Sequence, residues 1–316
     1  MNSGAAARRK SGLRGNAMRY GYVGLGNLGG HLAASLIRAG HQVTVYDRDP
    51  SLAERHAALG AHIAGSVSDL AGRVDHVFTC LPHPSASEVV LAEMLTVLPE
   101  GATWIENSTL GRDDVLRLAG LARVGGLRML EAPVTGGVHL AARGEITVLV
   151  GGEQDLFDLH RPALQAIGNR IFHMGPLGSA AVIKVITNML AFIHLVADGE
   201  ALMLAKRGGL DLKTAWEAIA ASSGSSFVHE TEGQLILNGS YDIAFTMDLA
   251  LKDLGFAMGF GREFGVPLDL AAMTAQTFLK GKAVYGGAAQ STQIVKLLED
   301  ALGTDLRAEG FPARLE

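Results

Sequence analysis

Short apolar runs alternate with amphipathic helical stretches along the chain from Met18 to about His173. Runs rich in Val, Ile, Tyr and Phe are typical of strands, whereas apolar positions about 3.6 residues apart, as in Gly30–Ala39 and Ser87–Leu98, are typical of helices. The predicted strands are Arg19–Val23, Gln42–Tyr46, His76–Cys80, Thr103–Glu106, Arg128–Ala132, Ile146–Val150 and Ile171–Met174. Strands that alternate with helices predict βαβ units, a mostly parallel sheet and therefore a doubly wound α/β fold.

Beyond Gly178 the pattern changes to long helical segments with hardly a strand signal. Breaks at Gly208-Gly209, at Ser222–Ser226 and at Asn238-Gly239 separate these segments. We therefore expect three parts along the chain. Residues 1–17 form a disordered basic extension, residues 18–178 an α/β domain, and residues 179–316 an all-helical domain.

The composition limits the classes of partner. The chain has 27 Lys and Arg against 32 Asp and Glu, a net charge of −5, and no basic stripe, so no nucleic acid partner is expected. An apolar stretch follows Lys184, but Thr187, Asn188 and His194 interrupt it. Its first charge, Asp198, comes before the roughly 18 apolar residues that a membrane span needs. We expect a soluble protein without a membrane partner.

Two features bear on location. The single cysteine, Cys80, cannot form an internal disulfide, which suits a reducing compartment such as the cytoplasm. Residues 1–17 carry four basic side chains and no acid. This segment is either a presequence that directs the protein to an organellar matrix or a disordered extension ahead of a second start at Met18.

A glycine-rich turn follows the first predicted strand. The sequence Gly24-Leu25-Gly26-Asn27-Leu28-Gly29 has the GxGxxG spacing, which is weak evidence alone in a chain with 40 glycines. Here a strand precedes the motif and a helix follows it, as in a dinucleotide-binding Rossmann-type domain. The first glycine allows the tight turn, the second admits the pyrophosphate, and the third lets helix and strand pack closely. The helix start offers free N–H groups to the phosphates. The alternative is an ordinary glycine-rich turn.

The second strand ends in Asp47, near the offset of the acid that binds the ribose in such domains. A carboxylate there accepts hydrogen bonds from both ribose hydroxyls and repels the 2′-phosphate of NADP, so we expect NAD as the cofactor. Arg48 follows directly and would hold that phosphate if it turned inward, which leaves NADP open.

Three further segments follow in order along the chain. They are EAPVTGG at 131–137, GPLGSAAVIKVITNM at 175–189 and LKDLGFAMGFGREFGVPL at 251–268. Together with the glycine loop, this order closely resembles the β-hydroxyacid dehydrogenase family from Met18 to about Glu299. The chain departs from the family pattern at Ser179-Ala180, at Thr187 and at Gln290. The last two departures concern substrate choice.

The resemblance implies roles for individual residues. Thr135, Gly136 and Gly137 would hold the substrate carboxylate, Lys184 would be the catalytic lysine, and Asn188 would orient the substrate. Further cofactor contacts would come from Leu81, Pro82, Ser108, Thr109 and Lys252. The helical part would then serve substrate binding and assembly into a homo-oligomer, a dimer or a tetramer.

The lysine can also be examined without the family. At about 100° per residue, Asn188 lies about 40° to one side of Lys184 on a helix and Asp198 about 40° to the other. Polar side chains on one side of an apolar helix are costly to bury unless they face a cavity or partners. Burial also lowers a lysine pKa toward the working pH, as a general base for an alcohol requires. The alternative is a lysine that extends to the surface at a helix start.

The expected function is hydride transfer between a nicotinamide cofactor and a small β-hydroxy acid or its semialdehyde. Two rivals stay open: an imine reductase of the same fold, and a non-catalytic nucleotide-binding module. The sequence has neither an HExxH motif nor a Cys/His ligand spacing, so no metal site is expected.

Overall fold

The computed structural model describes residues 18–315, so the predictions about residues 1–17 lie outside the described residues. The strands are β1 (Arg19–Val23), β2 (Gln42–Tyr46), β3 (His62–Ile63), β4 (His76–Thr79), β5 (Thr103–Glu106), β6 (Arg128–Glu131), β7 (Val134–Thr135), β8 (Ile146–Gly151) and β9 (Gly168–Gly175). The helices among them are α1 (Gly29–Arg38), α2 (Pro50–Ala57), α3 (Val67–Ala71), α4 (Pro84–Met94), α5 (Arg112–Val124), α6 (Val138–Arg143) and α7 (Gln154–Ile167). Helices alone follow β9, apart from an isolated bridge between Thr246 and Gln290.

The strands form one sheet in the order β3-β2-β1-β4-β5-β6-β8-β7, with β9 paired to β8. The pairs from β3 through β6 are parallel, while β8 runs antiparallel to β6 and β7. The order reverses between β1 and β4, which is the switch point where doubly wound sheets bind ligands. The α/β prediction is confirmed. All seven predicted strands are present, but β3 and β7 were missed because two-residue strands carry no periodicity.

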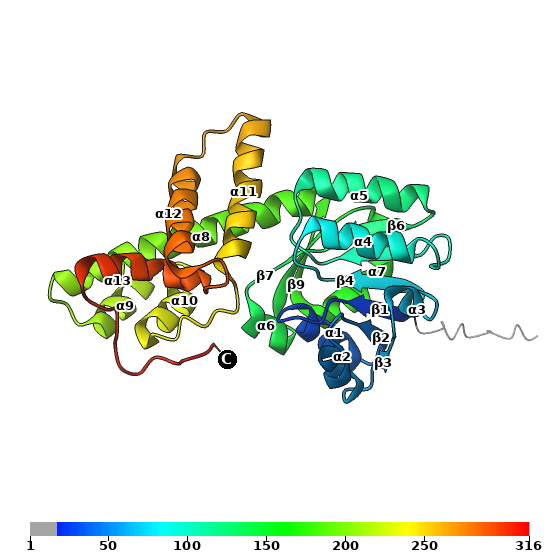
Figure 1. Ribbon diagram of the computed structural model, residues 1–316, viewed down its shortest axis with the longest axis horizontal. Helices are drawn as coiled ribbons and strands as arrows, with labels where there is room; N and C mark the ends of the chain where they lie inside the picture. The colour runs from blue at the N-terminus through cyan, green and yellow to red at the C-terminus, as the bar shows by residue number, and fades with distance from the viewer. Residues whose placement is uncertain (1–17, 316) are drawn as a thin grey trace, which may run out of the picture.

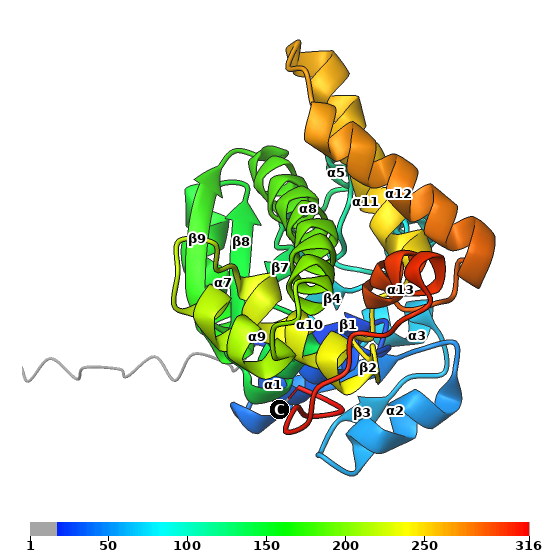
Figure 2. The same cartoon turned by 90° about the vertical axis from the view of Figure 1, so that its left-hand side faces the viewer.

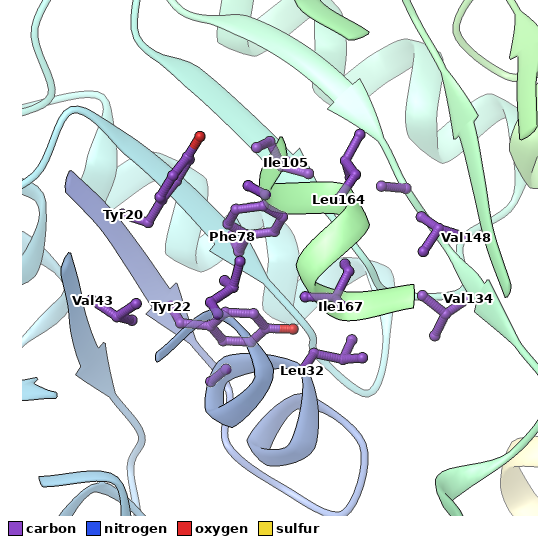
Figure 3. Close-up of a cluster of buried hydrophobic side chains, with 14 of the residues drawn as sticks. Tyr20, Tyr22, Leu32, Val43, Phe78, Ile105, Val134, Val148, Leu164 and Ile167 are labelled. Carbon is purple, nitrogen blue, oxygen red and sulfur yellow. The ribbon is translucent and has the colours of Figure 1, made fainter. Parts of the chain in front are cut away.

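Helices cover both faces of the sheet (Figure 1). One buried cluster contains side chains of β1, α1, β4 and α7, and Figure 3 shows how Tyr22, Phe78, Leu164 and Ile167 interlock there. The Tyr22 and Phe78 rings stack with centroids 5.8 Å apart. The other face packs α3, α4 and α5 over Trp104 and its neighbours. These two apolar layers fix the carboxyl ends of β1 and β4, where the glycine loop begins.

The helical part begins with α8 (Ser179–Arg207), which runs from the sheet through the remaining helices (Figures 1 and 2). It is followed by α9 (Leu212–Ala220), α10 (Phe227–Asn238), α11 (Met247–Phe264), α12 (Asp269–Tyr285), the short 3₁₀ helix η1 (Ser291–Val295) and α13 (Lys296–Leu302). The predicted breaks have clear causes. Gly208 ends α8, Ser226 caps α10 by accepting from the His229 N–H at 3.0 Å, and Gly239 ends α10 with a φ of 88°.

Of the helices between residues 18 and 315, α8 alone has the length and composition of a membrane span. The sequence prediction that this stretch is too short for a membrane span is wrong. It considered only the residues from Lys184 to Asp198, whereas the helix extends from Ser179 to Arg207. In this fold α8 packs against β8, α10, α11 and α12, and two of its charged residues, Lys184 and Asp198, are buried. The absence of a membrane partner stays a prediction.

Candidate active site

The glycine loop joins β1 to α1 with no space for side chains at two positions. A Cβ on Gly24, whose φ is +93°, would lie 2.3 Å from the Cys80 carbonyl oxygen, and one on Gly29 would lie 2.1 Å from the Gly24 oxygen. A Cβ on Gly26 would meet nothing within 4 Å. Leu28, at the start of α1, makes no side-chain cap. The loop therefore leaves open space at Gly26 in front of a helix start without a side-chain cap, which suits the pyrophosphate of a dinucleotide.

Asp47 lies beside this loop at the end of β2. Its Oδ2 accepts from the Leu25 N–H at 2.7 Å, and its Oδ1 accepts from the Asp49 N–H at 2.9 Å. Arg48 is exposed and makes no hydrogen bond or ion pair with the residues that the structure describes. The carboxylate is thus fixed at the loop, and the guanidinium is free.

The ends of β4 and β5 meet opposite the loop. The Leu81 N–H donates to Ser108 Oγ at 2.7 Å, and Ser108 in turn donates to Glu106, a buried acid whose pKa is raised by burial. Cys80 is partly buried, packs against the apolar cluster around Tyr22 and Phe78, and lines a cavity. Burial and the nearby Glu106 nevertheless raise the pKa of its thiol to about 12, which makes it unreactive.

This cavity, about 400 Å³ in volume, lies between the sheet and the helical part. Most of the predicted site residues line it. They are Gly26, Asn27, Leu28, Gly29, Leu81, Pro82, Ser108, Thr109, Thr135, Gly136, Gly137, Lys184, Asn188 and Lys252. Gly24, Leu25, Asp47 and Arg48 lie outside its lining. The chain thus brings the predicted substrate residues and most predicted cofactor residues around one cavity. Asp47 and Arg48, which are predicted to lie at the ribose, are outside its lining.

Lys184 lies in this cavity and is only 7% exposed. Burial lowers its pKa to about 8, with Asp253 opposing the shift and Lys252 adding to it. Its Nζ donates to Asn188 Oδ1 at 2.7 Å, and the Asn188 amide donates to Asp253 Oδ2 at 2.6 Å. A lysine with a pKa near neutrality and a fixed direction can act as a general acid or base. The surface interpretation of Lys184 is therefore wrong.

Lys252 extends the same chain of contacts. Its Nζ is 2.9 Å from Asp253 Oδ1 and donates to the Thr109 carbonyl oxygen at 2.9 Å. The contact ties α11 to the loop after β5. Asp253 accepts from Asn188 and pairs with Lys252.

Asp198 belongs to a different cluster from Lys184, contrary to the sequence expectation. It is buried, and its Oδ1 lies 2.5 Å from His229 Nδ1 on α10. His194, which lies between Lys184 and Asp198 on the same helix, is exposed. Along α8 the polar side chains therefore serve two places, the cavity near Lys184 and the helical core near Asp198.

The turn after β7 consists of Thr135, Gly136 and Gly137. Gly136 has a φ of +125° and Gly137 a φ of +89°, values that favour glycine. A Cβ on Gly136 would lie 2.8 Å from the Leu140 side chain. The backbone N–H groups of such a turn can form a concave anion site. The turn faces the cavity that holds Lys184.

Glu131 is a residue of the site that sequence reasoning did not single out. It lies at the end of β6, is 1% exposed, and accepts from the N–H groups of Gly178, Ala180 and Ala181 at 2.6, 3.0 and 2.9 Å. Burial raises its pKa to about 7, against the lowering effect of these three donors. The acid therefore caps the start of α8 one turn before Lys184. Two sequence signals for this contact were available. One is an acid at the end of a predicted strand, and the other is a helix start that has no capping residue of its own.

Among residues 18–315, no group of three or more His, Cys, Asp or Glu side chains is arranged to hold a metal ion. The fold, the open glycine loop and the lysine in the cavity define the class of a nicotinamide-dependent oxidoreductase.

Comparison with known proteins places the chain in a family. The model of the NAD binding domain of 6-phosphogluconate dehydrogenase matches residues 19–175, and the model of the NAD-binding region of NADP-dependent 3-hydroxyisobutyrate dehydrogenase matches residues 178–298. The 2-(hydroxymethyl)glutarate dehydrogenase of Eubacterium barkeri is 31% identical, over 92% of this chain and 98% of that relative. The L-threonate dehydrogenase of Cupriavidus necator is also 31% identical, over 88% and 95%.

Solved structures agree with this placement. A 3-hydroxyisobutyrate dehydrogenase from Salmonella typhimurium matches with a TM-score of 0.83 and 28% identity, over 89% of this chain and 99% of that one. The chain belongs to the β-hydroxyacid dehydrogenase family, and it is an NAD(P)-dependent dehydrogenase that acts on CH–OH groups.

Proposed function

We propose that this enzyme oxidises a small β-hydroxy carboxylate to its semialdehyde, and reduces the semialdehyde in reverse, with Lys184 as the proton-transfer residue. The observation that carries the proposal is the buried lysine itself, with a pKa of about 8 and a 2.7 Å hydrogen bond to Asn188. The printed names of the relatives, dehydrogenases of 2-(hydroxymethyl)glutarate and L-threonate, support a hydroxy acid as substrate.

The glycine loop and its surroundings fit a dinucleotide. Gly26 opens toward free space where the pyrophosphate would lie, and Asp47 is fixed beside the loop at the ribose end. Leu81, Pro82, Ser108, Thr109 and Lys252 would line the remaining length of the cofactor. When bound, the nicotinamide accepts or gives the hydride at C4. Because Asp47 disfavours a 2′-phosphate, we propose NAD as the better cofactor and NADP as the weaker one.

In oxidation, neutral Lys184 takes the hydroxyl proton as the carbinol C–H bond breaks and its electron pair leaves with the hydride. The carbinol carbon and oxygen then form the carbonyl, and the proton remains on Nζ. In reduction the ammonium returns this proton to the carbonyl oxygen. Asn188 holds Nζ through its amide oxygen, which leaves the other two N–H positions of the ammonium for the substrate oxygen and for solvent.

The substrate carboxylate would lie at the turn of Thr135, Gly136 and Gly137. Both glycines have a positive φ and line the cavity, so their backbone N–H groups would bind the carboxylate together with the Thr135 hydroxyl. The turn and Lys184 line the same cavity, so a carboxylate at the turn brings a neighbouring hydroxyl toward Nζ.

Lys184 also separates the proposal from its rivals. The resemblance to the β-hydroxyacid dehydrogenase family implies a catalytic lysine at this position, and a module that only sensed a nucleotide would need the glycine loop alone. The buried lysine is costly to keep without a proton-transfer role. We therefore favour alcohol oxidation over both alternatives.

We also propose that the enzyme works as a homo-oligomer built through its helical part, with residues 18–178 as the nucleotide-binding domain and 179–316 as the helical domain. Several apolar side chains of that part are exposed, with Leu204 at 75%, Met273 at 68% and Leu270 at 65%. The α11–α12 pair projects away from the other helices (Figures 1 and 2). Such a surface is typical of subunit contacts.

We propose a reducing compartment for this enzyme, either the cytoplasm or an organellar matrix, because its single cysteine cannot form an internal disulfide.

A coupled screen tests the proposed function. Purified protein with NAD or NADP is mixed with short β-hydroxy acids, α-hydroxy acids, simple alcohols and cyclic amines, and absorbance at the reduced-nicotinamide band is followed. We expect turnover of at least one β-hydroxy carboxylate and none of the matching alcohol without a carboxylate. Turnover of cyclic amines alone would refute the proposal in favour of imine chemistry.

A further inference from the structure

Glu232 is an acid of the cavity that the reaction described above does not use. It lies on α10, on the face that also presents Phe227, Val228 and Thr231 to the cavity. Its carboxyl makes no hydrogen bond or ion pair with any residue in the described range 18–315. Burial, together with the negative charge of Asp198, raises its pKa to about 8. Glu232 is partly buried, so its carboxyl faces the cavity without a protein partner, and an ionisable group placed in this way is a candidate contact for a ligand.

A second acid lies behind Glu232. Asp198 on α8 has one oxygen, Oδ1, paired with His229, while Oδ2 is buried without a hydrogen-bond partner. This free oxygen lies against α10, since a Cβ on Gly233 would be 3.1 Å from it. Gly233 follows Glu232 directly. The α10 end of the cavity is therefore negative, and only part of the Asp198 charge is offset by His229.

The other end of the cavity carries the opposite sign. Lys184 and Lys252 lie there with Asp253 between them, and these are the charges that act on the Lys184 amine. Lys184 and Asp198 are fourteen positions apart on α8, which is a rise of about 21 Å along the helix axis at 1.5 Å per residue. The side chains between the ends include Ala191, Phe192 and Phe245, which are apolar.

We propose that Glu232 is a specificity-determining residue which binds an ammonium group at the far end of the substrate chain. The inference rests on the proposed function, because it takes the carboxylate and hydroxyl to lie at the Thr135 turn and Lys184. The substrate class is then a β-hydroxy acid whose carbon chain ends in an amino group. Its carboxylate faces the positive end, its methylene groups cross the apolar middle, and its ammonium pairs with Glu232.

Other chain ends fit this arrangement less well. A second carboxylate would lie against Glu232 with the buried charge of Asp198 behind it, and like charges in a partly desolvated cavity repel strongly. A methyl end would leave the Glu232 carboxyl without a partner. An ammonium satisfies the carboxyl and reduces the cost of ionising it.

The test uses β-hydroxy acids of equal chain length that end in a methyl, a hydroxyl, an ammonium or a carboxylate group. The value of kcat/KM is measured for each with the wild-type enzyme, Glu232→Gln and Glu232→Lys at saturating cofactor. We expect the wild type to prefer the ammonium end over the methyl end by at least about tenfold. The preference should fall to near unity in Glu232→Gln and turn toward the carboxylate end in Glu232→Lys. Ratios between substrates cancel any loss common to all of them.

Glu230→Gln is the matched control, since Glu230 is an exposed acid on the same helix that bonds Ser225 and lies outside the cavity lining. It should keep the wild-type preference. A wild-type preference for the carboxylate or the hydroxyl end would overturn the assignment, as would an ammonium preference that survives Glu232→Gln. If methyl-ended acids are oxidised without any such preference, only this inference fails; if no hydroxy acid is oxidised, the proposed function fails with it.

Discussion

Lys184 Nζ donates a 2.7 Å hydrogen bond to the side-chain oxygen of Asn188, one turn along α8. Asn188 donates through its amide to Asp253, which is 1% exposed. The buried acid thereby acts on the lysine in two ways: it fixes the orientation of Asn188, and its charge favours the ammonium form. The pKa of Lys184 is thus set by two opposing effects. Burial favours the neutral amine, and Asp253 favours the ammonium, so the group can both lose and regain a proton.

The balance predicts a pH dependence. Oxidation requires neutral Lys184, so kcat/KM for the hydroxy acid should rise with pH and level off above about 8, the pKa of the lysine. Asp253 raises that pKa, so Asp253→Asn should move the midpoint to lower pH. The measurement is the pH profile of kcat/KM. Asp248→Asn is the control, because Asp248 lies on the same helix but pairs with Lys282 at the surface. A midpoint that stays in place, or rises, in Asp253→Asn would contradict this reading of the site.

Glu131 should position Lys184 through the start of α8. In Glu131→Gln the carboxamide nitrogen cannot accept an N–H bond, so one of the three donors loses its partner. We expect the free energy of unfolding in urea to fall by about 1–3 kcal/mol. We also expect kcat to fall while the dissociation constant of the nucleotide stays the same.

The comparison variant for Glu131 is Glu145→Gln, which removes an exposed acid near the start of β8. It should change neither quantity. If Glu131→Gln lowered stability and left kcat untouched, Glu131 would hold the fold together without positioning the lysine.

Much of the fold was readable from the sequence because its signals are local. Period-2 and period-3.6 patterns, the glycine spacing and the helix breaks at Gly208 and Gly239 each depend on a few neighbouring residues. Lys184 and Asn188, four positions apart on one helix, were also within reach. The same helix geometry gave a wrong neighbourhood for Asp198. Its angle relative to Lys184 was correct, but fourteen positions along α8 the side chain lies in the helical core, where it pairs with His229 of α10.

The acids of the site show what sequence patterns cannot contain. Glu131 caps α8 by accepting from N–H groups that lie 47 to 50 residues later, and Glu232 meets the cavity only because α10 packs along α8. Such contacts are decided by packing between distant segments. A strand of two residues, as in β3 or β7, likewise exists only through its neighbours in the sheet.

Cofactor choice should depend on Asp47. The carboxylate is held at the loop by the Leu25 N–H, whereas Arg48 is exposed and unpaired within residues 18–315. We expect kcat/KM to favour NAD over NADP by at least about tenfold, or about 1.4 kcal/mol. Asp47→Asn should narrow or reverse the ratio, and Arg48→Ala should leave the NAD value unchanged. Equal turnover with both cofactors in the wild type would show that Arg48 governs the pocket.

The most direct test of Lys184 as the proton-transfer residue is Lys184→Ala, with kcat measured on a hydroxy acid that the wild type oxidises and nucleotide affinity measured by titration. Lys184 contacts Asn188 rather than the glycine loop, so the nucleotide dissociation constant should stay within about twofold of the wild-type value. General acid–base catalysis is worth about 10²–10⁴ in rate, so kcat should fall by that factor. A variant that binds the nucleotide normally and keeps more than about half of the wild-type kcat would contradict the assignment.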